Sequence, residues 1–175
     1  MRQKGLVCLE LLQKMMLAED SNRYLTKRGS AQVDINTMER WQSEWDASEK
    51  GRWTHRLIPC ISTWVNRKHG ELNFTLTQFL SGHGCFREYL HKVGHAESPL
   101  CPTCDQVVET AEHVVFTCPR FQSARREMMA CTGANVANIT QLMCKDERAW
   151  AVVDKTVAEI MKQLQAKWKI DQMSA

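Results

Sequence analysis

The sequence predicts a mainly α-helical protein, a helical bundle with little or no sheet. Apolar residues recur at intervals of three and four in several segments, which is the spacing of one helix face. Residues that punctuate strands and hairpins are sparse, since 175 residues contain only 8 glycines and 4 prolines. Cysteine and histidine residues gather between Cys101 and Cys118, and we expect the helices to be built around this cluster.

The composition is that of a folded globular protein, with 43% hydrophobic and 25% charged residues. The net charge of +3 is too small to indicate an anionic partner by itself. No apolar run reaches the ~18 residues of a membrane span. Charged residues interrupt the N-terminal apolar stretch, so we expect neither a signal peptide nor a membrane partner.

Eight cysteines would indicate a disulfide framework in a short secreted chain. This chain is long enough to bury a core without crosslinks, and it shows no export signal. We therefore expect the cysteines outside the cluster to be reduced core residues, which points to an intracellular, reducing compartment. These are Cys8, Cys60, Cys85, Cys131 and Cys144.

The N-terminal part of the chain is predicted to hold one helix and a linker. Residues 6–18 place apolar side chains at helical spacing on one face. Core packing is the simpler interpretation of that face, and docking of a partner is the alternative. Residues 20–35 are polar and contain glycine and serine, which indicates a loop or linker.

The next helices are predicted from their end signals. One begins at Asn36, where Glu39 completes a capping box, and ends near Gly51. Another begins at Pro59, because a missing N–H costs nothing at the first helical position. It ends at Gly70, a residue suited to the left-handed conformation that follows many helices.

The remaining helices lie on both sides of the cysteine cluster. Residues 75–93 form two short pieces broken at Gly82 and Gly84, and Pro119 starts a helix after the cluster. The last element, 146–170, carries a seam typical of a coiled coil. We expect it either to pack within the chain or to mediate self-association. The seam consists of Trp150, Val153, Val157, Ile160 and Leu164.

The cluster reads CPTCDQVVETAEHVVFTC, a C-x2-C-x8-H-x4-C pattern. Structural zinc takes four Cys or His ligands in a tetrahedron and leaves no open position for catalysis. The pattern therefore predicts one structural Zn²⁺ held by Cys101, Cys104, His113 and Cys118. The long gap leaves room for a helical turn at His113. Because Cys118 lies off the α-helical face of His113, the chain must leave the helix to deliver it.

Four further potential ligands lie just upstream: His83, Cys85, His91 and His95. They include no C-x2-C pair, so we expect them to pack or to hydrogen-bond around the first site rather than to form a second one. The predicted segments are a helix and linker (1–35), a helical segment rich in Trp and Arg (36–98), a CCHC zinc finger (99–120) and C-terminal helices (121–175).

Basic residues flank the cluster, and some alternate with tryptophan. Lys and Arg neutralise phosphates and exposed aromatic rings stack on unpaired bases, so this pattern predicts nucleic-acid contacts. The alternative is a solvated helix face with tryptophans in the core, and Asp105, Glu109 and Glu112 oppose phosphate contact on the finger itself. The predicted contact residues are Arg52, Arg56, Arg67, Lys68, Arg87, Lys92, Arg120, Arg125 and Arg126.

The motifs GRWT (51–54), LTQFLSGHG (76–84) and the cluster with its trailing PRF (119–121) resemble the C-terminal region of non-LTR retrotransposon polyproteins. The type-1 elements inserted in arthropod ribosomal DNA are the most similar, over about residues 38–126. The resemblance implies the same four zinc ligands and a nucleic-acid-binding region in the nucleus. That region follows a reverse transcriptase, an RNA-directed DNA polymerase, with an endonuclease upstream. The implied partners are RNA or DNA and the polymerase part of the same polyprotein.

No catalytic centre can be assembled from these residues. The seven aspartates include no adjacent pair for two-metal phosphoryl transfer. We therefore expect a non-catalytic nucleic-acid-binding zinc-finger region of a retrotransposon polyprotein, one that supports target-primed reverse transcription and takes no small-molecule substrate. The alternative is a zinc-stapled protein-interaction or structural domain that does not bind nucleic acid.

Overall fold

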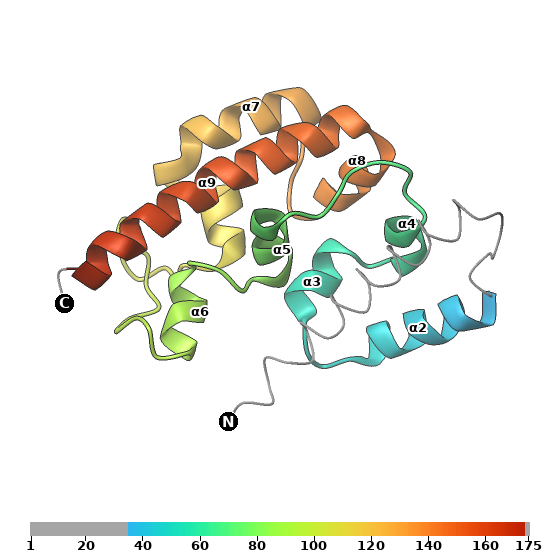
Figure 1. Cartoon of the computed structure of the whole chain (residues 1–175), viewed down its shortest axis with the longest axis horizontal. Coiled ribbons are helices and arrows are strands. Elements are labelled where there is room, and N and C mark those ends of the chain that lie inside the picture. Colours follow the sequence, from blue (N-terminus) through green and yellow to red (C-terminus); the bar gives the residue numbers. More distant parts are fainter. Residues whose placement is uncertain (1–34, 174–175) are drawn as a thin grey trace.

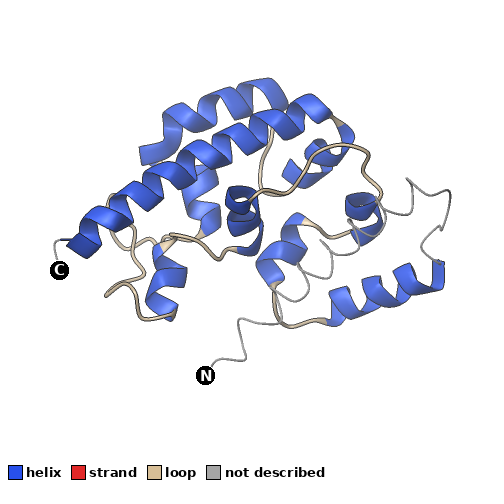
Figure 2. Cartoon of the chain, in the orientation of Figure 1, coloured by secondary structure: helices blue, strands red, loops and turns tan. Residues whose placement is uncertain are grey.

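The computed structural model describes residues 35–173, and this range is helical without a strand (Figures 1 and 2). The expected mainly α-helical class is confirmed. The predicted helix 6–18, Cys8 and the linker before residue 35 lie outside the described residues. The α-helices are α2 (Ile35–Ala47), α3 (Arg52–Leu57), α4 (Ile61–Val65), α5 (Phe74–Ser81), α6 (Arg87–Lys92), α7 (Gln122–Thr132), α8 (Ile139–Lys145) and α9 (Glu147–Met173).

The long helix α9 crosses the molecule and packs against α5, α7 and α8 (Figure 1). All five residues of the predicted seam, from Trp150 to Leu164, are buried. Burial of each such side chain stabilises the fold by roughly 1.5–3 kcal/mol. The predicted helix 146–170 is confirmed, and its seam faces the core of its own chain. Self-association through this helix stays a prediction and would need another face.

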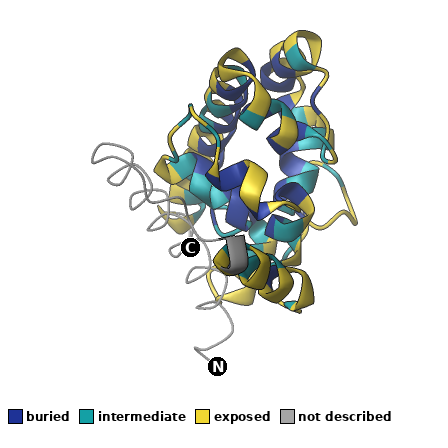
Figure 3. Ribbon diagram, turned by 90° about the vertical axis from the view of Figure 1, so that its right-hand side faces the viewer, coloured by how far each residue is buried: buried dark blue, intermediate teal, exposed yellow. Residues whose placement is uncertain are grey.

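Helices α2, α3 and α4 lie at the lower right of Figure 1, and two tryptophans of this part are buried. Figure 3 shows the buried residues on the inward sides of the helices. The indole N–H of Trp45 on α2 donates to the Ile58 carbonyl oxygen at 2.8 Å. Trp64 on α4 is 1% exposed. The Trp45 bond ties α2 to the end of α3, and the Trp64 ring packs on Trp150 of α9 at 5.6 Å between ring centres, so both tryptophans serve the core.

Several helix boundaries differ from those expected. Helix α2 ends at Ala47, and the unexpected helix α3 follows Gly51, whose φ of 66° turns the chain between them. Helix α4 covers only Ile61–Val65 rather than the whole of 59–70. The breaks predicted at Gly82 and Gly84, between α5 and α6, are confirmed.

Helix α4 is short because the chain after it turns to pack on α9. The Arg67 guanidinium carbon lies 4.4 Å from the Trp64 ring centre and 4.8 Å from that of Trp150. The guanidinium also donates to the Trp64 carbonyl oxygen at 2.6 Å. A Cβ at Gly70 would lie 2.1 Å from the Trp150 ring, so only glycine fits there. Arg67, one of the predicted phosphate contacts, thus packs between α4 and α9 instead.

The cysteines outside the cluster do not share one environment. Cys60 and Cys131 are exposed, so the expectation that they are core residues is wrong for both. Cys60 lies just before α4, and Cys131 lies on the solvent face of α7. Cys85 and Cys144 are half-buried against the core. None of the described cysteines forms a disulfide.

The hydrophobic core is continuous across the predicted segments 36–98, 99–120 and 121–175. Buried residues from each segment, such as Trp64, Val114 and Ile160, belong to one cluster. The division of the chain into four segments stays a prediction. Among the described helices, none combines the length and apolar character that a membrane span requires.

Candidate metal centre

The four predicted ligands come together in space. One potential ligand atom from each of Cys101, Cys104, His113 and Cys118 lies within 4.8 Å of the other three. The Sγ atoms of Cys101 and Cys118 are 3.8 Å apart. Two thiolates at the usual Zn–S distance on a tetrahedral ion would be about 3.8 Å apart, whereas a disulfide needs about 2.05 Å. The site therefore has the dimensions of a metal centre.

The first two ligands are presented by a tight backbone loop. The Cys101 N–H donates to the Val107 carbonyl oxygen at 2.8 Å, and the Val107 N–H donates to the Cys104 carbonyl oxygen at 3.0 Å. Gln106 adopts φ 65°, the left-handed conformation that few non-glycine residues take. The loop closes with an isolated antiparallel bridge between Leu100 and Val108.

The third ligand, His113, is held in one tautomer by a neighbouring hydroxyl. The Thr117 hydroxyl donates to the His113 carbonyl oxygen at 3.0 Å, so its oxygen is free to accept from His113 Nδ1, also at 3.0 Å. This leaves the proton-free Nε2, which is buried without a partner in the protein. Burial, and the positive charges of Arg120 and Arg125, lower the pKa of His113. A neutral ring with a free Nε2 is what a metal ligand requires.

The fourth ligand, Cys118, follows a π-helical turn, His113–Thr117. The Cys118 N–H donates to the His113 carbonyl oxygen at 2.7 Å, a bond that spans five residues rather than four. The wider turn brings Cys118 back beside His113, and the chain leaves the helix at Cys118 before Pro119. The expected exit from the helix is confirmed, but the π turn that prepares it was not foreseen.

The three thiols lie close enough to perturb one another. Burial, together with the nearby Cys118 and Cys101, raises the pKa of Cys104 to about 11. Three thiolates packed this closely would repel one another without a cation between them. A bound divalent cation reverses that balance, because coordination favours the thiolate over the thiol. The chemistry of the ligand set therefore fits Zn²⁺.

Arg125 supports the turn that carries the last two ligands. Its side chain is buried, and its guanidinium donates to the carbonyl oxygens of Cys118 at 2.9 Å and Val115 at 3.2 Å. A π turn followed by a break leaves such carbonyls without helical partners. The structure therefore buries Arg125 beside the metal centre, where it supports the backbone of the ligand turn, and the expectation that it contacts phosphate is corrected.

Arg120 is the second predicted phosphate contact that serves the site. It forms an ion pair with Glu109, which is 2% exposed. The Glu109 carboxylate also accepts from the Arg87 N–H at 3.3 Å, and so ties α6 to the segment between Cys104 and His113. The negative charge of Glu109, which was expected to oppose phosphate contact on the finger, is therefore paired with Arg120 inside the protein.

The upstream ligand candidates do not join the centre. Within residues 35–173, the group at the centre is the one set of three or more His, Cys, Asp or Glu side chains placed to hold a metal ion. Cys85 and His95 border a hollow near Glu109 and Arg120, whereas His83 packs against Tyr89 at 4.7 Å between ring centres. His83 and Cys85 are half-buried, in line with the expectation that these residues pack, whereas His91 and His95 are exposed and do not.

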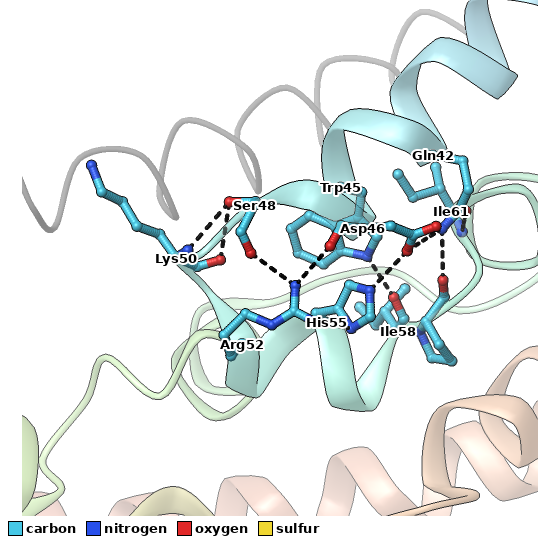
Figure 4. Close-up of polar contacts among 10 residues, drawn as sticks. Gln42, Trp45, Asp46, Ser48, Lys50, Arg52, His55, Ile58 and Ile61 are labelled. Atoms are coloured by element: carbon cyan, nitrogen blue, oxygen red, sulfur yellow. Dashed lines mark hydrogen bonds and ion pairs between the residues drawn. The ribbon is translucent and has the colours of Figure 1, made fainter.

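The other predicted phosphate contacts differ in accessibility. Arg52 is exposed, donates to the Ser48 carbonyl oxygen at 2.8 Å and contacts His55 Nδ1 at 3.0 Å (Figure 4). His55 in turn contacts Asp46 at 2.8 Å, which lowers the pKa of that carboxyl group.

Arg56 forms an ion pair with Glu112. Arg87 lies 4.0 Å from Asp171, and Lys68, Lys92 and Arg126 are exposed.

Fold and site together define a helical domain closed by a metal centre of three cysteines and one histidine. In sequence, the chain is similar to Pol polyproteins of the type-1 retrotransposable element R1. It is 35% identical over 85 residues to such a polyprotein of Bradysia coprophila, which covers 49% of this chain and 8% of the relative. It is 37% identical over 93 residues to the R1 2 polyprotein of Nasonia vitripennis, covering 53% and 22%. It is 31% identical over 126 residues to the polyprotein of Popillia japonica, covering 70% and 46%.

These similarities confirm the resemblance that the motifs indicate. The chain spans between 8% and 46% of the length of these relatives, so what it shares with them is a region of a polyprotein. No family model matches the chain. No solved structure matches it either.

Proposed function

We propose that this chain is the non-catalytic zinc-finger region of a retrotransposon polyprotein, that it binds RNA or DNA, and that it supports target-primed reverse transcription. The similarity to R1 Pol polyproteins supports the first part of this proposal. The polymerase part of the same polyprotein is the proposed protein partner. The nucleus is the proposed compartment, because the target of such a reaction is chromosomal DNA.

The observation that carries nucleic-acid binding is a group of cations beside the metal centre. Arg52, Arg56 and Lys92 border one hollow, which the segment that leads into His113 also lines. The Arg56–Glu112 ion pair holds α3 against that segment. Arg52 and Lys92 are exposed, and among the described residues neither forms an ion pair, so both charges can face a phosphate. Arg52 does so while its guanidinium also donates to the Ser48 carbonyl oxygen.

The alternative, a zinc-stapled structural or interaction domain, is favoured by a different observation. Arg67, Arg120 and Arg125 all serve internal contacts, which removes three cations from the predicted phosphate-binding set. Replacing the downstream arginines together would disturb the metal centre, so such a variant does not test nucleic-acid binding.

Salt dependence separates the two functions. The affinity of the zinc-loaded protein for single-stranded RNA, single-stranded DNA and duplex DNA is measured over a series of salt concentrations. Nucleic-acid binding predicts an affinity that falls steeply with salt, because phosphate contacts release counterions. An Arg52→Ala/Lys92→Ala variant should lower the slope for single strands by up to about 1.4, or 0.7 for each lost contact.

The matched control removes the same charge elsewhere. Arg148 and Lys162 are exposed on α9 and do not border the hollow. Their double alanine variant should keep the wild-type slope. Equal losses in the two variants would mean that only net charge matters, and a protein that does not bind any of the three nucleic acids would support the structural alternative.

A further inference from the structure

We propose that the hollow between α3, α6 and the segment 108–112 is a subsite for one unpaired base of single-stranded nucleic acid, with the adjoining phosphate on its cationic border. This inference rests on the proposed nucleic-acid binding and adds the place and the mode of contact. The hollow has a volume of about 700 Å³. That volume lies in the range of small-ligand sites and exceeds what one nucleotide needs.

The walls of the hollow supply aromatic rings that are already fixed in place. The Tyr89 and His83 rings lie 4.7 Å apart between centres. The Trp53 indole N–H donates to the Phe79 carbonyl oxygen at 2.8 Å, and its ring packs edge-on against Phe79 at 5.9 Å. Because the protein already holds these rings in place, stacking a base on them costs little side-chain entropy.

The polarity of the inner wall suits a neutral base. Burial and the charge of Lys92 lower the pKa of His83, so its ring is uncharged at neutral pH. His83 Nδ1 is buried without a partner in the protein. Val108 and Ala111 complete the wall with apolar surface. Stacking faces and apolar contacts recognise the flat face of any base, and so predict little sequence preference.

The charges at the border favour a single nucleotide over a duplex. The hollow is bordered by three cations and two carboxylates, which leaves one net positive charge. The cations are Arg52, Arg56 and Lys92, and the carboxylates are Glu88 and Glu112. That charge suits one phosphate group, whereas the two backbones of a duplex would bring several phosphates against the carboxylates. The carboxylates can also accept from the exocyclic amino groups of bases.

The metal centre makes this subsite depend on zinc. Val108, Ala111 and Glu112 belong to the segment between the second and third ligands. Loss of the metal would release that wall, so binding of an unpaired base should be lost together with the metal. A phosphate contact made by α3 alone would survive.

The test compares a short oligothymidylate with an abasic deoxyribose-phosphate strand of the same length. The two strands carry the same phosphates but differ in their bases. Wild-type protein should prefer the oligothymidylate by about tenfold, the scale of one stacked base. Tyr89→Ala should abolish that preference with the salt slope unchanged, and Tyr89→Phe should retain it.

A second measurement needs no variant, in case Tyr89→Ala does not fold. Wild-type protein is photocrosslinked to an oligonucleotide that contains 5-iodouracil, and the attached residue is mapped by mass spectrometry. Crosslinks to Tyr89, Trp53 or His83 support the subsite. Salt-dependent binding with equal affinity for both strands, and crosslinks only outside the hollow, would overturn the subsite and leave the proposed function intact. Absence of binding to either strand would overturn both.

Discussion

The guanidinium of Arg125 and the carbonyl oxygen of Cys118 are joined by a hydrogen bond of 2.9 Å in the protein interior. This contact links the start of α7 to the last ligand of the metal centre. A residue of an apparent basic ridge is therefore a structural element of the site. Its exposed neighbour, Arg126, lies on the same helix without that contact.

We predict that Arg125→Ala lowers the free energy of unfolding by about 3 kcal/mol, because it leaves buried carbonyl groups without donors. Arg126→Ala should change it by less than about 0.5 kcal/mol, as is usual for an exposed position. Urea denaturation of the two variants measures both values. Equal effects would show that the Arg125 contacts contribute nothing specific.

We predict one zinc ion per chain, released by Cys104→Ser. Serine does not supply the thiolate that structural zinc requires, so the variant should also lose order over about residues 95–130. Metal analysis and hydrogen exchange test the two parts. Cys131→Ser, a change at an exposed position on α7, should retain the metal. A metal-free wild-type protein with the same fold would contradict the assignment.

We predict that Thr117→Val weakens zinc binding by 10- to 100-fold, the usual effect of losing a partner that orients a histidine ligand. The substitution keeps the shape of the side chain but removes the oxygen that accepts from His113 Nδ1. Thr117→Ser restores that oxygen and should bind nearly as well as wild type. Competition with a chromophoric chelator measures the affinity.

We predict that acid weakens the fold partly through His83. Its pKa in the folded protein is lowered from 6.5, so the folded state binds fewer protons than the unfolded state. The contribution of the neutral His83 ring to the free energy of unfolding is fully present above pH 6.5. It is lost as the pH falls through 6.5 towards the lower pKa of the folded state. Between about pH 7.5 and pH 5.5, wild type should therefore lose more stability than His83→Phe. Parallel pH profiles from urea titrations would exclude this role.

The metal ligands and the helical class could be predicted from sequence because both depend on local spacing. The four ligands fall within Cys101–Cys118, and the seam of 146–170 repeats at helical intervals. The short helices α3 and α8 and the π turn span at most seven residues each, too few for such a pattern to repeat. Helix α4, in turn, ends where packing on Trp150 begins, and that contact depends on residues far apart in the chain.

The roles of the arginines could not be predicted for a related reason. A sequence shows that Arg67, Arg120 and Arg125 are charged, but not whether the fold buries them beside an acceptor or an aromatic ring. The Arg67 guanidinium lies against two tryptophan rings, those of Trp64 and Trp150, that only the tertiary structure brings together. Exposure of a charged residue is thus decided by contacts that are absent from its local sequence.

The position of α9 has a consequence for the order in which the protein folds during its synthesis. The Asn73 amide on one side of the bundle donates to the Asp154 carboxylate at 2.7 Å, across 81 residues of chain. Before α9 leaves the ribosome, the apolar faces of α5, α7 and α8 have no cover, and such surfaces bind chaperones or aggregate. The metal ligands, by contrast, lie within a short stretch that closes at low entropic cost. We therefore expect the nascent chain to take up its metal first and to close its core only when α9 has been made.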